Sequence, residues 1–348
     1  MYALLIFSKT PGKTRWGGAF NKLNHTYDNI ISLDNLLEAW KEFVRGKRKR
    51  KDVQNFQLHL MDNVLALHND LKNKTYKHSL YEYFRITDPK IRDIHKACVR
   101  DRLLHYAVYR MLYPFFDTLF TADSYSCRLG KGNHKALNWF REFAYVESKN
   151  RTKSVWVLKC DIRKFFANIN HNSLRYIVMK YIEDEDVNWL LSKIIESFRS
   201  TREGIGLPLG NLTSQLFVNI YMNEFDQFVK RELKIKHYIR FADDFVILSS
   251  DKERLEKILL EIKKFLKDKL KLEVHPNKVF IKSLVSGVDF LGWVHFPDHR
   301  VLRTITKRRM LKNLTNNPSS ETVVSYVGLL KHGNTYHLKQ LLEMEEDL

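Results

Sequence analysis

The chain has 348 residues, which suits an enzyme of two or three lobes around one main core better than a single ordinary domain. Hydrophobic residues make up 44% of it and aromatic residues 13%, so a disordered chain is excluded. Lys and Arg outnumber Asp and Glu by 59 to 40, and the formal charge of +19 favours a polyanionic partner, nucleic acid first. No apolar run approaches the roughly 18 residues of a spanning helix, so we expect no membrane insertion.

Export and disulfide bonding are not expected either. The apolar stretch 1–7 has no basic segment before it and is shorter than a typical secretory core. Cys98, Cys127 and Cys160 are odd in number and have no close pair, which disfavours a disulfide framework and a zinc site. We therefore expect a cytoplasmic protein.

The first predicted elements are two helices separated by a basic run. Apolar residues from Leu33 to Val44 recur at helical spacing behind a candidate cap at Ser32. A second helix is expected from Phe56 to Leu71. For the basic run 47–51 we favour a phosphate contact over a solvated helix face.

The middle of the chain predicts a buried strand and helices. Residues 154–162 are apolar on both faces, as in a central strand, and the apolar run ends at Asp161. Helices with one apolar face are expected from about Asn172 and from Thr213.

A hairpin follows. The β-type runs 238–241 and 245–248 place Ala242-Asp243-Asp244 at a tight turn. Ser249-Ser250-Asp251 then caps a long helix, and 278–281 supplies a last strand. This order predicts an α+β fold with a split βαβ, ferredoxin-like antiparallel sheet backed by helices.

Three carboxylates are the candidate metal ligands. Polymerisation of nucleotides uses two metal ions roughly 3.5 to 4 Å apart, and magnesium prefers oxygen ligands. Asp161 at a strand end and Asp243-Asp244 at a hairpin turn could converge on such ions. An Asp-Asp pair alone is more often a solvated turn, but here both flanking strands are strongly apolar.

From about Tyr27 to the C-terminus the sequence resembles the reverse transcriptase family, through 159–166 (KCDIRKFF) and 241–244 (FADD). The resemblance implies a right-hand polymerase with two Mg²⁺ ions, for which Mn²⁺ could substitute. It assigns metal ligation to Asp161, its neighbour Ile162, Asp243 and Asp244. It also places Arg163, Lys164 and Phe166 at the nucleotide, with Phe166 excluding a 2′-hydroxyl; plain core packing is the alternative for Phe166.

Further motifs match the same family. Segment 88–92 resembles the part of the fingers that binds the triphosphate, which makes Lys90 and Arg92 candidate phosphate ligands. An ordinary surface charge is the alternative for either residue. Lys278 matches the lysine proposed to protonate pyrophosphate. Phe290-Leu291-Gly292 resembles the primer-gripping turn, although a simple β-turn is the alternative. Basic residues of the thumb, Lys307 and Arg308 among them, would contact the duplex unless they form a solvated helix face.

The resemblance also predicts the domain organisation. We expect an N-terminal extension at 1–26, fingers at 27–153, a palm at 154–297 that includes the nucleotide-contacting motif 204–216, and a short thumb at 298–348. From the length of this thumb segment we expect no RNase H, integrase or endonuclease domain.

Segment 206–215 (GLPLGNLTSQ) narrows the resemblance. Most relatives have glutamine where this chain has Leu209, before Gly210, and proline where it has Gln215. Together with 127–137 and 333–338, the segment resembles the reverse transcriptases of diversity-generating retroelements. That group copies a template-repeat RNA into cDNA with frequent errors opposite adenine, which diversifies a target gene by mutagenic retrohoming.

The expected partners are template RNA, a DNA primer and dNTPs, and by resemblance alone a small, basic, oligomeric helical accessory protein. One alternative is a faithful reverse transcriptase of a retron, a group II intron or a phage-defence system; Leu209 and Gln215 argue against the first two. Another is a catalytically silent RNA-binding scaffold. The presence of all three aspartates argues against that reading.

Overall fold

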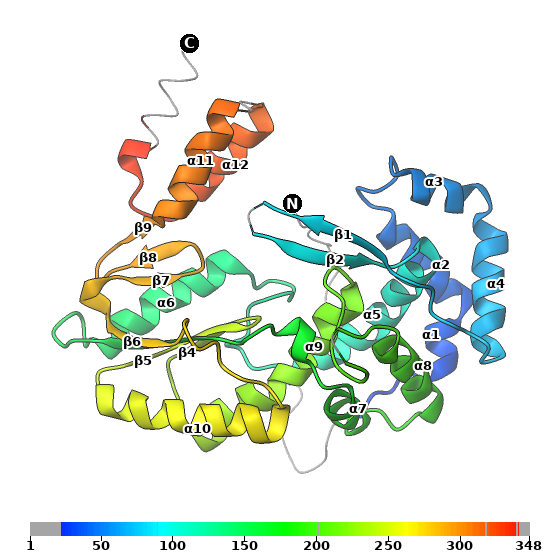
Figure 1. Ribbon diagram of the computed structural model, residues 1–348, viewed down its shortest axis with the longest axis horizontal. Helices are drawn as coiled ribbons and strands as arrows, with labels where there is room; N and C mark the ends of the chain where they lie inside the picture. The colour runs from blue at the N-terminus through cyan, green and yellow to red at the C-terminus, as the bar shows by residue number, and fades with distance from the viewer. Residues whose placement is uncertain (1–21, 89, 201, 317–318, 339, 341–348) are drawn as a thin grey trace.

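The computed structural model describes residues 22–88, 90–200, 202–316, 319–338 and 340. The expected N-terminal extension lies largely outside these residues. Helices α1–α5 and the hairpin β1–β2 form one side of the molecule, the main sheet with α10 forms the other, and α11 and α12 stand above the sheet (Figure 1).

The N-terminal helices are α1 (Tyr27–Ile31), α2 (Leu33–Phe43), α3 (Lys51–Leu58), α4 (Leu60–Lys72) and α5 (Val99–Leu119). The first predicted helix is confirmed as α2, and the Ser32 hydroxyl accepts a hydrogen bond from the Asn35 N–H at 3.2 Å. The second was wrong as one helix. It is divided into α3 and α4 because the backbone of His59 leaves the helical region, at φ −120° and ψ 43°.

The basic run 47–51 does not point outward as a whole. Lys47 donates from Nζ to the Phe43 carbonyl at 2.7 Å and to the Tyr106 hydroxyl at 3.2 Å, and it lies over both rings. Burial, followed by the charges of Arg50 and Arg102, lowers the pKa of Lys47 to about 8. A phosphate contact therefore remains a prediction for Arg48 and its following neighbours, not for Lys47.

The main sheet has four antiparallel strands, β3 (Trp156–Asp161), β4 (Tyr238–Phe241), β5 (Asp244–Ser249) and β6 (Phe280–Ser283). Their spatial order is β4-β5-β3-β6. Helices α7 (His171–Met179), α8 (Glu185–Glu196) and α9 (Leu212–Gln227) connect β3 to β4, and α10 (Lys252–Leu270) connects β5 to β6. This is the ferredoxin-like order, so the predicted α+β sheet is confirmed.

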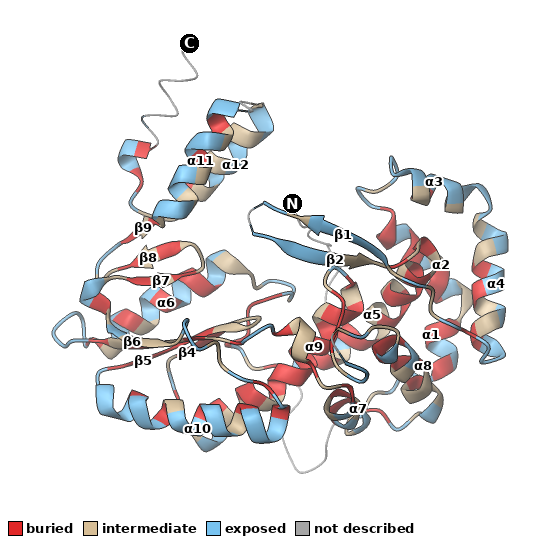
Figure 2. Cartoon of the chain, in the orientation of Figure 1, coloured by how far each residue is buried: buried red, intermediate tan, exposed pale blue. Residues whose placement is uncertain are grey.

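Both faces of β3 are buried, as the sequence predicted. Leu158 and Cys160 belong to the core shared with α9 and α10, whereas Val157 belongs to the core formed with α6 (Asn133–Glu147). Successive side chains of a strand point to opposite faces, so a run that is apolar throughout joins two cores. The buried interior extends from the sheet through α9 into α5 (Figure 2).

A smaller sheet and two helices follow the main sheet. Its strands are β7 (Val288–Phe290), β8 (Trp293–His295) and β9 (Arg300–Leu302), and they lead to α11 (Thr304–Asn316) and α12 (Ser320–Leu330). A third core contains Trp293, Leu302 and Met310. The remaining elements are β1 (Glu82–Ile86), β2 (Arg92–Lys96) and the short turns η1 (Phe166–Asn168), η2 (Phe228–Glu232) and η3 (Leu284–Ser286).

Candidate active site

The three aspartates lie at the edge of the main sheet where β3 ends and β5 begins. Asp161 is the last residue of β3 and lies opposite Asp244, the first residue of β5. Phe241 pairs with Asp244, so Ala242 and Asp243 form a two-residue turn between β4 and β5. Ala242 has φ +57°, a left-handed conformation that is costly for a residue with a Cβ. The turn must therefore be held in place by its surroundings.

A buried arginine holds this turn. The Arg240 guanidinium, which is fully buried, donates from Nη1 to the Ala242 carbonyl at 3.2 Å. It also donates hydrogen bonds to both oxygens of the Asp226 carboxylate, from Nε at 2.7 Å and from Nη2 at 2.6 Å. Further bonds run from Nη2 to the Ser124 hydroxyl at 2.9 Å and from Nη1 to Asn219 Oδ1 at 3.4 Å. The turn that carries Asp243 is thus connected to α9.

Two lysines neutralise part of the carboxylate charge. Lys278 Nζ lies 3.1 Å from Asp161 Oδ2, and Lys159 Nζ lies 3.4 Å from Asp244 Oδ2. Lys159 also donates to the Asp289 carbonyl at 2.9 Å. The predicted Lys278 therefore lies at the carboxylates, together with Lys159, to which the sequence reasoning gave no role.

Burial and mutual repulsion disfavour the charged forms of the aspartates. Burial, followed by the charge of Asp161, raises the pKa of Asp243, against which Lys278 and Lys90 act. Burial raises the pKa of Asp244 to about 7, although Lys159 opposes this shift. Because the neighbouring carboxylates repel one another, positive charge between them would favour their ionised forms.

The donors fit a hard divalent ion. Asp244 Oδ1 is buried and has no hydrogen-bond partner among the described residues, so one oxygen is left for a ligand. Carboxylate oxygens are what Mg²⁺ and Mn²⁺ prefer. As placed, no group of three or more Asp, Glu, His or Cys side chains in the described part of the chain could by itself hold a metal ion. Ile162 is buried and its N–H donates to the Asp243 carbonyl at 3.1 Å, so only its carbonyl oxygen could serve as a ligand.

The candidate nucleotide-contacting residues lie on neighbouring turns. Phe166 is half-buried, and its carbonyl accepts from the Leu207 N–H at 2.8 Å, which ties η1 to the segment before Leu209. Leu209 is half-buried and Gly210 is exposed with φ +108°. Gln215 lies half-buried in the first turn of α9. Leu209 therefore lies at the margin of the packed interior and not within the fully buried core.

The basic candidates spread over several elements. Lys90 is exposed between β1 and β2, and its charge opposes the rise in the pKa of Asp243. Arg92 is exposed at the start of β2 opposite Ile86. Arg163 Nη1 lies 3.7 Å from Glu273 Oε2, and Lys164 is exposed.

The expected primer-gripping turn is a tight hairpin. Leu291 and Gly292 both have positive φ, +50° and +85°, between the paired residues Phe290 and Trp293. Phe290 is fully buried, so its ring supports the hairpin from inside and cannot contact a nucleic acid. The exposed thumb candidates Lys307 and Arg308 lie on α11, which follows β9.

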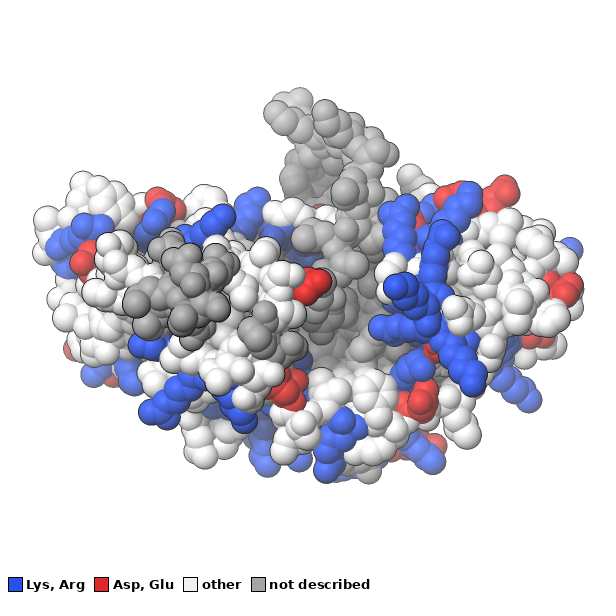
Figure 3. All heavy atoms as spheres, turned by 90° about the horizontal axis from the view of Figure 1, so that it is seen from above, with Lys and Arg blue, Asp and Glu red and all other residues white. Residues whose placement is uncertain are grey.

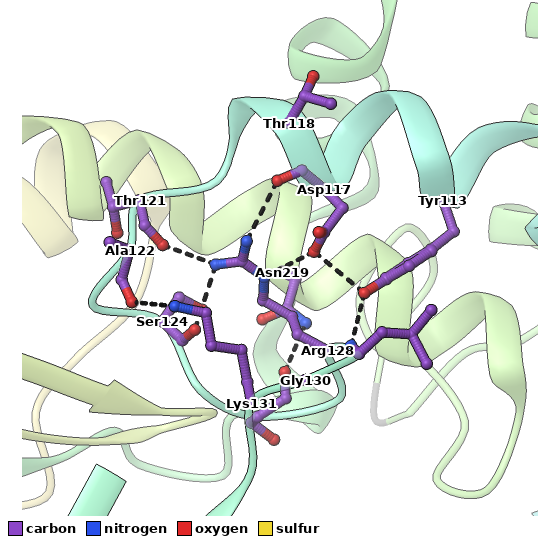
Figure 4. A network of polar contacts seen from close by, with 12 residues as sticks. Tyr113, Asp117, Thr118, Thr121, Ala122, Ser124, Arg128, Gly130, Lys131 and Asn219 are labelled. Atoms are coloured by element: carbon purple, nitrogen blue, oxygen red, sulfur yellow. Dashed lines mark hydrogen bonds and ion pairs between the residues drawn. The ribbon is translucent and has the colours of Figure 1, made fainter. Parts of the chain in front are cut away.

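Motif 127–137 forms a structural network (Figure 4). The Arg128 side chain is 6% exposed and donates from Nε to Asp117 Oδ1 at 2.7 Å and from Nη1 to the Thr121 carbonyl at 2.6 Å. Lys131 Nζ donates to the Ala122 carbonyl at 2.7 Å. The loop 123–125, just before this motif, pairs with β4. The Tyr125 N–H donates to the Arg240 carbonyl and the Arg240 N–H to the Asp123 carbonyl, both at 2.9 Å.

Lys and Arg side chains gather in a stripe on the helical side of the molecule, facing its middle, in the view from above (Figure 3). Such a stripe suits a polyanion. No helix among the described residues is long and apolar enough to cross a membrane.

Sequence reasoning missed Lys159, Arg240 and Asp226. Lys159 could have been found, because it stands two residues before Asp161 and so points to the same face of β3. The partnership of Arg240 with Asp226 joins a strand to a helix and has no local signal in the sequence.

Comparison with known proteins places this geometry in a family. The sequence profile described as reverse transcriptase (RNA-dependent DNA polymerase) matches residues 77–295. Protein YkfC of Escherichia coli is 26% identical over 260 residues, which are 64% of this chain and 66% of that protein. The group II intron-encoded protein LtrA of Lactococcus lactis is 25% identical over 305 residues, 68% of this chain and 49% of that protein.

The chain thus spans between half and two thirds of the length of these relatives. Apo telomerase from Candida tropicalis, truncated from its C-terminal domain, is 14% identical with a TM-score of 0.49, and covers 70% of this chain and 60% of that one. That likeness is too weak to add to the argument. The ferredoxin-like sheet agrees with the profile match, and the chain, with its right-hand polymerase fold, belongs to the reverse transcriptase family.

Proposed function

We propose that this protein is an RNA-directed DNA polymerase that uses Asp161, Asp243 and Asp244 as its metal ligands. The observation that carries the proposal is the pairing of Asp161 with Asp244 beside a turn that presents Asp243. When two divalent ions are bound there, they favour ionisation of the primer 3′ oxygen and neutralise the leaving pyrophosphate.

The residues of the chain then position the reactants. Lys278 lies beside Asp161, where it can hold a proton for the pyrophosphate, and Lys90 adds positive charge on the side of β1–β2. We assign 27–153 to fingers, 154–297 to palm and 298–348 to a short thumb. In this arrangement β1–β2 extends from the fingers over the middle of the molecule (Figure 1).

Primer extension on an RNA template with Mg²⁺ tests the polymerase. We expect wild type to incorporate dNTPs and Asp243→Asn to lose nearly all incorporation, because an amide is a weaker ligand than a carboxylate. Asp268→Asn, on the exposed side of α10, is the matched control and should leave the rate unchanged. Equal incorporation by wild type and Asp243→Asn would refute the assignment and favour a silent RNA-binding scaffold.

We further propose that the protein is of the diversity-generating type and copies a template-repeat RNA with errors opposite adenine. The support is the resemblance of segment 206–215 to that group, in which Leu209 replaces the glutamine of the common family pattern. The loss of one hydrogen bond is worth about 0.5 to 1.5 kcal/mol, or roughly three- to tenfold in discrimination. Leu209 is half-buried and apolar, so it can limit the space around a base pair without fixing its hydrogen-bonding pattern.

The test is to sequence cDNA made on the cognate RNA. Leu209→Gln should lower errors opposite adenine by roughly three- to tenfold, from the hydrogen bond that it restores. Leu260→Gln, at a leucine that is 67% exposed on α10, is the control and should not change the error spectrum. If the error spectrum of Leu209→Gln were the same as that of wild type, Leu209 would not be a cause of the errors opposite adenine.

A faithful reverse transcriptase is the second candidate, and the intron-encoded protein LtrA among the relatives favours it. A low error rate with no excess of errors opposite adenine would support this alternative. We also propose template RNA and a DNA primer as partners, with a small basic helical accessory protein. If the isolated chain made template-directed cDNA as well as the complex did, the dependence on that accessory protein would be wrong.

A further inference from the structure

A cavity lies at the end of the small sheet that is farther from the Leu291–Gly292 turn. It has a volume of about 470 Å³ and is enclosed by α6, by the turn between β8 and β9, and by the segment that follows α12. Its lining includes Asn138, Arg141, His299, Arg300, Lys331 and His332. The volume is large enough for a phosphate group with part of the molecule that carries it.

The wall of this cavity contains an arginine without a counter-ion. Arg300 is 9% exposed, and it donates from Nε to the His332 carbonyl and from Nη2 to Asn138 Oδ1 at 3.1 Å. Its Nη1 is buried with no hydrogen-bond partner among the described residues. The guanidinium lies over the Trp293 ring, 5.8 Å from the ring centre, and no ion pair with a carboxylate is found for it in that part of the chain. A guanidinium out of water costs several kcal/mol unless an anion compensates for its charge.

Apart from Asp298, the rest of the lining is also positive or neutral. Arg141 and Lys331 are exposed at the cavity, and Arg141 Nη2 lies 3.7 Å from Oε1 of the exposed Glu142. Asp298, the one acidic residue of the lining, is bonded to His299 at 2.7 Å. His295 is 3% exposed and its Nε2 has no partner among the described residues. The cavity therefore offers several donors and little negative charge.

We propose that this cavity binds a phosphate group, with Arg300 as its buried cation and with Arg141 and Lys331 at its mouth. Phosphate suits the site because its oxygens accept several hydrogen bonds at once. Arg300 already donates from Nε and Nη2, so Nη1 is the nitrogen of its guanidinium that is left for an anion. Asn138 gives its carbonyl oxygen to Arg300, so its amide nitrogen is left as a further donor. The phosphate belongs either to a free small molecule or to the backbone of bound nucleic acid.

The lining of the cavity contains none of the three aspartates. Residue 295 lies at one end of β8 and residue 293, next to the Leu291–Gly292 turn, lies at the other. Segment 333–338, which the polymerase chemistry does not use, supplies part of the wall, and the Asn334 N–H donates to the Arg300 carbonyl at 2.8 Å. The phosphate site gives this segment a function of its own.

The test is calorimetric titration of the full chain with inorganic phosphate, at constant ionic strength set with chloride. We expect saturable binding of one phosphate per chain. The double variant Arg141→Gln/Lys331→Gln should bind at least tenfold more weakly, as should Arg300→Gln. The double variant changes exposed side chains, so it keeps the test valid if Arg300→Gln fails to fold.

Two controls accompany the titration. Lys264→Gln, at an exposed lysine of α10, should bind phosphate as wild type does, and so should Asp243→Asn. No saturable binding, or equal affinity in wild type and the double variant, would overturn the proposal. Preference for a polyglutamate peptide over phosphate would also overturn it.

A competition experiment between inorganic phosphate and an RNA–DNA hybrid identifies the source of the phosphate. Saturation with an RNA–DNA hybrid should abolish inorganic phosphate binding if the site takes a backbone phosphate, and the double variant should then also bind hybrid more weakly. Unchanged phosphate binding in the presence of hybrid identifies a free phosphate-bearing molecule. Both outcomes support the phosphate site.

Discussion

The buried pair of Arg240 and Asp226 should be among the most sensitive points of the molecule. We consider the substitution Arg240→Met, which keeps much of the side-chain length but removes the guanidinium. It deletes two hydrogen bonds to Asp226 and single bonds to Ser124, Asn219 and the Ala242 carbonyl. Because it leaves a buried carboxylate without its cation, we expect the free energy of unfolding to fall by about 3 to 5 kcal/mol. This is a large part of the roughly 5 to 15 kcal/mol typical of a domain.

Urea denaturation of the full chain, followed by circular dichroism, measures this loss. The double variant Arg240→Met/Asp226→Leu removes both charges, so it should be less destabilised than the sum of the single variants by at least about 1 kcal/mol. Primer extension by the folded fraction should still be weak, because the Ala242 turn has lost its donor. A loss below about 1 kcal/mol for Arg240→Met, or strict additivity of the two substitutions, would refute the reasoning.

Three further changes test other parts of the fold. Gly333→Ala places a Cβ against the Trp293 ring and should destabilise the chain by about 1 to 3 kcal/mol in thermal unfolding, whereas Gly328→Ala, with nothing within 4 Å, should not. Burial lowers the pKa of His105 to about 3, far below its unfolded value, so the unfolded state binds more protons as pH falls below about 6.5. The resulting loss of stability, about 3 kcal/mol at pH 4, should be absent in His105→Leu when unfolding is measured against pH; an equal pH dependence in both proteins would contradict it. Ser32→Ala removes a helix cap and should cost about 0.5 to 2 kcal/mol in urea denaturation.

The sequence predicted the parts of the fold that depend on local periodicity. The doubly apolar run at β3, the turn that carries Asp243 and the cap at Ser32 each follow from the spacing of neighbouring residues. Helical spacing from Phe56 to Leu71 did not reveal the break at His59, because one residue with non-helical backbone preserves the apolar pattern approximately. Local sequence patterns therefore predicted whether a segment is a helix or a strand better than they predicted where one helix ends and the next begins.

The site was predictable in its aspartates and less so in what surrounds them. Asp161 and Asp243 stand out because carboxylates beside apolar strands need a reason to be there. The burial of Phe290 and the contacts of Arg240 depend on which elements pack together, which one sequence does not specify. The same holds for the cavity at Arg300, whose walls come from three separate segments.

The pairing of the loop 123–125 with β4 also covers part of one edge of the main sheet, where β4 is the outer strand. A strand at the edge of a sheet offers unpaired N–H and carbonyl groups to other chains and so promotes aggregation. Here the backbone of Arg240 is bonded on its outer side to Asp123 and Tyr125, and Arg128 holds that loop in place. Loss of Arg128 should therefore appear first as poor solubility during expression, before any defect in copying is measured.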